Sequence, residues 1–224
     1  MTLLLPGYHL QLAKRTGVEI QVVPETAEGD IDLAALEALI LQADRPRPRL
    51  ISITHVPTSS GRVYDAAGVG RLARKHSVLF MLDACQSVGQ LPVDVRGIGC
   101  DFATGTGRKF LRAPRGSGFL FCARHALAAF EPAAIDNTGA AWGPEPDQYS
   151  LAPTARRFEQ YEMSFASKVR GGDWWWVGTV CGLLVGWAGG RVLCLKSASL
   201  HCAAPTACSA LASSIRGCLF SQSA

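Results

Sequence analysis

The sequence predicts an α/β domain built on a mostly parallel sheet. Short runs rich in β-branched and apolar residues alternate with segments whose apolar residues recur at helical spacing, the pattern of strands joined by helices. Residues 78–82 form a continuous apolar run that ends at Asp83, as expected of a parallel strand buried on both faces. Of the 224 residues, 48% are hydrophobic and 18% are charged, so the chain can bury a sizeable core.

The first third of the chain predicts one strand and the start of a well-capped helix. Gly17 is placed to end a preceding helical segment, and residues 18–23 alternate in the manner of a strand. Asp30 or Asp32 can cap a helix over residues 33–40, whose apolar residues recur at helical spacing.

The same alternation continues through the middle of the chain. A short β-rich run covers residues 50–54, and Asp65 then opens a helix that extends to about residue 75. Residues 102–121 are expected to form a loop around Lys109 followed by a hairpin-like return.

Composition and charge exclude several classes of function. The net charge of +4 is modest, and no Lys/Arg run suggests a nucleic-acid surface. The basic segment at residues 45–49 alternates arginine with proline and is predicted to be an exposed connector. The first residues do not resemble a signal peptide, so we expect a cytoplasmic protein.

Two kinds of sequence meet near Lys168. Residues 169–224 carry only four Lys/Arg and one Asp, but five of the eight cysteines and four of the five tryptophans. Three interpretations are open: a membrane anchor at residues 174–190, a short globular extension, or a tail that is not native coding sequence. The third is favoured, because Lys168-Val-Arg-Gly is what an exon ending in AAG gives when it continues into a GTGAGGG splice donor. We therefore expect one domain over residues 1–168 and a tail over residues 169–224 that lies outside the fold.

Asp83 is the first candidate for a functional side chain. A carboxylate directly after a buried strand loses hydration unless it meets a cation or hydrogen-bond donors. Alone, it would equally well be a helix N-cap. However, it lies at the carboxyl end of a predicted parallel strand, as do Thr54 and His55, and ligands of α/β sheets bind at that edge.

Five motifs in order resemble the class V aminotransferase family, which includes cysteine desulfurases, selenocysteine lyases and isopenicillin N epimerase-like proteins. The similar segments are a G-x-I-D-L helix entry at 29–33, an S-H-V-S-N-x-x-G-like loop at 54–61, D-x-x-Q at 83–86 with Asp101 downstream, an S-G-H-K-like box at 106–109, and a G-P-x-G-x-G-like turn at 113–118. The resemblance covers about residues 10–168. It implies the three-layer α/β/α large domain of the fold-type I enzymes that use pyridoxal 5′-phosphate (PLP), present here in incomplete form.

The resemblance also implies a role for each matching residue. Lys109 would form a Schiff base with PLP and later move protons as general acid and base. Asp83 would keep the pyridine nitrogen protonated, and Gln86 would donate a hydrogen bond to the phenolic oxygen. Thr106 and Arg108 fall where the family binds the cofactor phosphate, and both side chains suit an anion.

Three further side chains differ from the family pattern or have another interpretation. Thr58 stands where many relatives carry an asparagine near the phenolic oxygen. His55 is a candidate for a position next to the cofactor ring, yet a structural loop histidine is the preferred interpretation. Glu162 replaces a threonine that desulfurases carry after an R-F-E box, which favours the epimerase-like or lyase branch. The sequence contains no CxxC pair, so no metal site is predicted, and the cysteines are expected to be structural.

The implied function is PLP-dependent chemistry on a small amino-acid substrate: transamination, epimerisation or C–S lysis, in a homodimer. The alternative is a catalytically inactive truncated isoform. The family's phosphate cup, its ring-stacking residue and its carboxylate-binding arginine have no counterpart in this sequence, so we expect truncation at both ends.

Overall fold

The computed structural model describes residues 11, 13–162 and 191–195, and within them it shows an α/β fold with a mostly parallel sheet. The strand order is β1-β8-β2-β3-β4-β5, and only the β4–β5 pair is antiparallel. The strands are β1 (Glu19–Val23), β2 (Pro48–Thr54), β3 (Leu79–Asp83), β4 (Phe102–Thr106), β5 (Gly118–Cys122) and β8 (Arg191–Leu195). The predicted fold class is confirmed.

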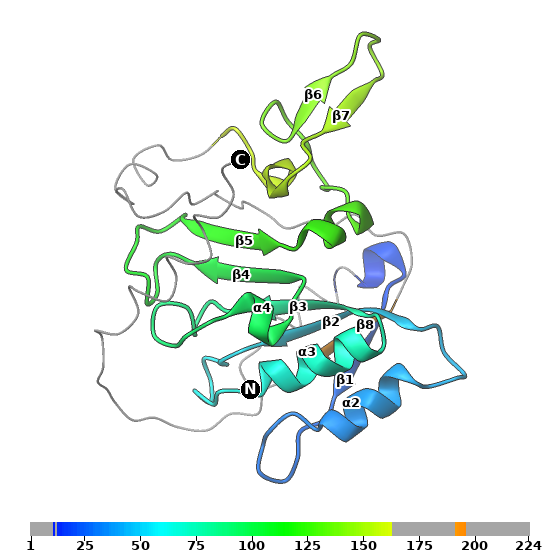
Figure 1. The fold of residues 1–224 in the computed structure, drawn as a ribbon, viewed down its shortest axis with the longest axis vertical. Helices are drawn as coiled ribbons and strands as arrows, with labels where there is room; N and C mark the ends of the chain where they lie inside the picture. Colours follow the sequence, from blue (N-terminus) through cyan, green and yellow to red (C-terminus); the bar gives the residue numbers. More distant parts are fainter. Residues whose placement is uncertain (1–10, 12, 163–190, 196–224) are drawn as a thin grey trace.

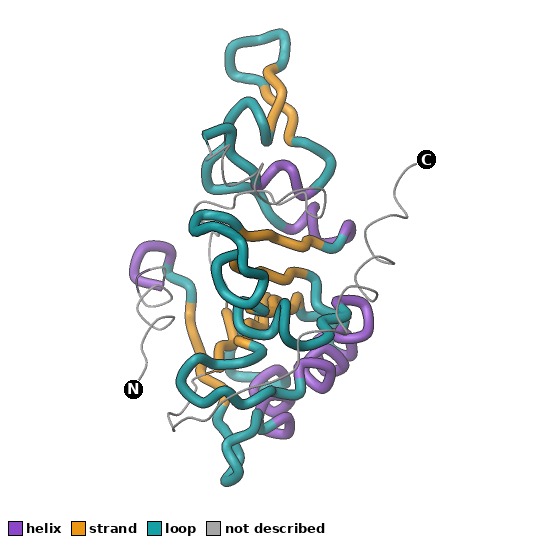
Figure 2. The backbone as a smooth tube through the Cα atoms, turned by 90° about the vertical axis from the view of Figure 1, so that its left-hand side faces the viewer, coloured by secondary structure: helices purple, strands orange, loops and turns teal. Residues whose placement is uncertain are grey.

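Three helices cover one face of this sheet (Figure 1): α2 (Leu33–Ile40), α3 (Ala66–Lys75) and the short α4 (Val95–Ile98). The helical turn at residues 13–16 lies on the other side (Figure 2). Asp32, not Asp30, caps α2 by accepting a hydrogen bond from the Ala35 N–H at 2.8 Å. Asp65 caps α3 through the Gly68 N–H at 2.7 Å, as the sequence predicts.

The central strand β3 is covered on both faces. Phe80 and Leu82 are fully buried in the core beneath α2 and α3, whereas Leu79 and Met81 pack into a second cluster around Phe102. This cluster includes the 3₁₀ helix η1 (Arg124–Ala129) and an edge-to-face contact in which the ring centroids of Phe102 and Phe130 are 4.8 Å apart. Burial on both faces explains the continuous apolar run, which an exposed strand would not require.

Residues 140–151 form a separate hairpin. Its strands are β6 (Ala140–Trp142) and β7 (Tyr149–Leu151), followed by the 3₁₀ helix η2 (Ala155–Phe158). The hairpin projects from the sheet at the top of Figure 1.

Strand β8 lies within residues 169–224, which the sequence predicts to be a tail. Its five residues pair in parallel with β1 on one side and with β2 on the other. The β1–α2–β2 connection leaves one strand position open between its two strands, and the apolar run after Gly190 fills it. The division of the chain at residue 168 stays a prediction. The suggested membrane anchor at residues 174–190 and the suggested splice junction at residues 168–169 both lie outside the described residues. Among the described residues, no helix is long and apolar enough to cross a membrane.

Replacing Leu193 by proline tests the position of β8. Proline cannot donate to a strand ladder, so a central strand should not tolerate it. We expect amide hydrogen exchange in β1 to accelerate at least tenfold, while amides of β4 and β5 on the far side of the sheet keep their protection. Unchanged exchange in β1 would show that it does not depend on β8.

Candidate functional site

The candidate residues gather at one edge of the sheet because the strands that precede them are parallel. In the register of the sheet, Thr54 at the end of β2 is the partner of Asp83 at the end of β3, and Asp83 is in turn the partner of Thr104 in β4. Thr106 is the last residue of β4, and the loops that leave these strands carry the remaining candidates at 58, 86, 108 and 109. The carboxyl edge predicted from the sequence is therefore one contiguous region.

Asp83 is held in place by its own turn. Its Oδ1 accepts the Cys85 N–H at 2.9 Å, and its backbone carbonyl accepts the His55 N–H at 2.9 Å. The next residue, Ala84, donates its N–H to Thr104 at 2.8 Å. A tight turn and no α-helix follows Asp83, so the N-cap interpretation does not apply.

Gln86 and Thr58 are brought together from different loops. Gln86 Nε2 donates to Thr58 Oγ1 at 2.7 Å, across 28 residues of sequence. Because a side-chain amide nitrogen carries two hydrogens, one N–H of Gln86 remains for a ligand.

Two glycines make close contacts in and against the loop that carries Lys109. Gly107 exchanges backbone hydrogen bonds with Ser117 and Ala113, each at 2.8 Å. A Cβ on Gly107 would lie 2.1 Å from the Ser117 hydroxyl oxygen, so no larger residue fits there. Gly89, at φ +91°, approaches the Phe110 carbonyl so closely that an added Cβ would lie 2.6 Å from its carbon. The turn after β3 therefore packs directly on the Lys109 loop.

The Cys85 thiol lies close to both Asp83 and Lys109. Burial and the nearby Asp83 carboxylate raise the pKa of this thiol to about 12, although the Lys109 cation and the Thr106 backbone N–H act in the opposite direction. Sequence reasoning treated Cys85 as structural and missed this location. Its place two residues after the end of the strand was the available signal.

The phosphate candidates differ in exposure. Arg108 is exposed at the tip of its turn, whereas Thr106 is half-buried at the end of β4, where it pairs with Gly118 of β5. Lys109 is also half-buried, and within the described part of the chain neither it nor Arg108 forms an ion pair. Both cations are thus available to an anionic ligand.

Two other residues from the motifs, Asp101 and His55, lie in different surroundings. Asp101 lies before the first residue of β4, at the opposite edge, where its Oδ2 accepts the Phe80 N–H at 2.8 Å. His55 is 7% exposed, and burial lowers its pKa, which favours the neutral ring. Its Nδ1 has no partner among the described residues. Within the same residues, no group of three His, Cys, Asp or Glu side chains could hold a metal ion.

The pKa of Cys85 leads to a testable pH dependence. Only the thiolate reacts with iodoacetamide, and a raised pKa keeps the thiolate scarce at neutral pH. We expect the alkylation rate at Cys85, mapped by mass spectrometry, to rise about tenfold per pH unit and to continue rising through pH 10. A plateau between pH 8 and 9 would contradict the raised pKa, and with it the burial of this thiol beside Asp83. Cys85→Ser provides the background.

Comparisons with known proteins identify the family of this chain. The family model for aminotransferase class-V matches residues 8–160. A probable cysteine desulfurase of Methanothermobacter thermautotrophicus is 33% identical over 70% of this chain and 38% of its own length. Isopenicillin N epimerase of Streptomyces clavuligerus is 34% identical over 65% of this chain and 35% of its own. The solved apo structure of a cysteine desulfurase from Thermococcus onnurineus NA1 superposes with a TM-score of 0.62 at 28% identity, covering 74% of this chain and 40% of that one.

The chain thus spans about two fifths of the length of the relatives it matches. PLP is the cofactor of this family. The order of the motifs, their convergence at one edge of the sheet and the family match over most of the chain lead to one conclusion: the chain belongs to the class V aminotransferase family.

Proposed function

We propose that this chain is the cofactor-binding part of a PLP-dependent enzyme that acts on an amino acid, with Lys109 as the residue that carries the cofactor. The observation that supports this most directly is the common neighbourhood of Asp83 and Lys109, whose opposite charges both act on the Cys85 thiol. A carboxylate and an amine in one small region are what a protonated pyridine ring and its aldehyde require.

The other side chains also fit PLP. The free N–H of Gln86 suits a phenolic oxygen, and the hydroxyl of Thr106 with the cation of Arg108 suits a phosphate. Each of these side chains therefore suits the part of the cofactor to which the resemblance assigns it.

Each residue has a distinct task in this proposal. When bound, PLP supplies an electron sink for a carbanion at the α-carbon of the substrate. Asp83, whose Oδ1 accepts the Cys85 N–H, would face the ring nitrogen and hold a proton on it. Lys109 binds the cofactor and, once its amine is free, carries a proton to or from the substrate α-carbon. Gln86 orients the ring through its phenolic oxygen.

Transamination, epimerisation and C–S lysis remain the candidate reactions. Relatives of two kinds, a probable desulfurase and an epimerase, match this chain at nearly the same identity. Glu162, where desulfurases carry threonine, supports the epimerase-like or lyase branch. A homodimer and a small amino-acid substrate belong to the same proposal.

Borohydride trapping tests the role of Lys109. Purified full-length chain is incubated with PLP and reduced, and the modified lysine is mapped by mass spectrometry. We expect a pyridoxyl adduct confined to Lys109 that disappears in Lys109→Ala and persists in the control Lys75→Ala, since Lys75 pairs with Glu37 on the helical face. No adduct, or labelling spread over surface lysines, would support the inactive-isoform alternative instead.

A further inference from the structure

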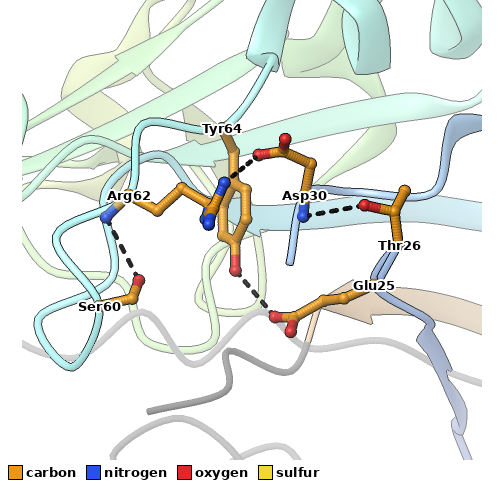
Figure 3. Close-up of polar contacts among 6 residues, drawn as sticks. All are labelled: Glu25, Thr26, Asp30, Ser60, Arg62 and Tyr64. Atoms are coloured by element: carbon orange, nitrogen blue, oxygen red, sulfur yellow. Dashed lines mark hydrogen bonds and ion pairs between the residues drawn. The ribbon is translucent and has the colours of Figure 1, made fainter. Parts of the chain in front are cut away.

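Two turns at the carboxyl edge of the sheet are joined by side chains. The first turn follows β1 and carries Glu25 and Asp30. The second is the loop between β2 and α3, which carries Arg62 and Tyr64 (Figure 3). The Tyr64 hydroxyl donates to Glu25 Oε1 at 2.8 Å, and Arg62 Nη1 pairs with Asp30 Oδ1 at 3.1 Å.

The loop that receives these contacts is the one that carries Thr58. It is closed at its base by the Tyr64 N–H, which donates to the His55 carbonyl at 3.0 Å, and at its tip by the Gly61 N–H, which donates to the Pro57 carbonyl at 2.8 Å. Movement of Tyr64 therefore moves the base of the loop and, with it, the Thr58 hydroxyl that orients Gln86.

The two contacts differ in strength. Tyr64 is 3% exposed, and both burial and the Glu25 carboxylate raise its pKa, so the hydroxyl stays protonated and remains a donor. The Arg62 and Asp30 side chains are 41% and 54% exposed, so their pair is screened and contributes little. The Arg62 guanidinium lies beside Gly29, 3.6 Å from where a Cβ would stand, which is ordinary van der Waals contact. The partly buried Tyr64–Glu25 hydrogen bond is thus the main connection.

Strand topology explains why such a connection matters. Strands β1 and β2 are not neighbours in the sheet, because β8 lies between them. The strand ladder therefore fixes the turn after β1 relative to the loop after β2 only through a third strand. Tyr64 and Glu25 join the two directly, across 39 residues of sequence.

We propose that Tyr64, assisted by Arg62, is a positioning residue for Gln86. By anchoring the Thr58 loop to the turn after β1, it holds the Thr58 hydroxyl where it presents the second N–H of Gln86 to the cofactor. The inference rests on the proposed function for its effect on PLP, but the anchoring itself concerns only the protein.

Tyr64→Phe removes a single hydroxyl and tests the anchoring without any cofactor. We expect amide exchange at Gly61 and Tyr64, which close the loop, to accelerate at least tenfold. The control Arg71→Ala breaks the exposed ion pair of Arg71 with Asp65 on α3 and should leave both amides unchanged. Arg62→Met should have a smaller effect than Tyr64→Phe. Equal protection of the loop in Tyr64→Phe and the unmodified protein would overturn the anchoring.

The absorbance spectrum of bound PLP tests the consequence for Gln86. A hydrogen bond to the phenolic oxygen sets the absorption maximum and its pH dependence, which a merely structural residue would not alter. We expect Tyr64→Phe and Thr58→Val to shift the spectrum in the same direction, with Thr58→Ser retaining the original spectrum. All variants should still give the borohydride adduct on Lys109. A loosened loop with an unchanged spectrum would overturn the positioning role, whereas a missing adduct in the unmodified protein would instead refute the proposed function.

Discussion

The parallel register of β2, β3 and β4 is the constraint on which the candidate site depends. Parallel strands end at the same edge, and here the pairing of Thr54 with Asp83 and of Asp83 with Thr104 aligns the last residues of three strands. Each loop then begins within one strand spacing of the next. Side chains separated by some fifty residues of sequence can therefore meet without any long excursion of the backbone.

Burial on both faces keeps this register in place. Phe80 and Leu82 face α2 and α3, while Leu79 and Met81 face the cluster around Phe102, so a one-residue slip would exchange two differently shaped surfaces. Glycine also allows close packing of the loops. At Gly89 the backbone of Phe110 comes so near that a Cβ would block it, and this contact packs the turn after β3 against the loop after β4.

Most of the fold could be predicted from local patterns. The caps at Asp32 and Asp65 and the apolar run before Asp83 are properties of adjacent residues, and the motifs around Gln86 and Lys109 supplied the candidate site. The insertion of β8 could not be predicted, because a strand between β1 and β2 depends on a gap that only the three-dimensional topology creates. The Tyr64–Glu25 hydrogen bond likewise joins distant segments, and Cys85 gains its importance from Lys109, which lies in another loop.

Hydrogen exchange on addition of PLP tests the central claim that three loops form a single cofactor site. The account predicts that PLP slows exchange together in residues 57–61, 84–88 and 107–112, with one dependence on PLP concentration, while η1 and the β6–β7 hairpin are unaffected. Protection of only one segment, or of none, would contradict a common site at the carboxyl edge of the sheet.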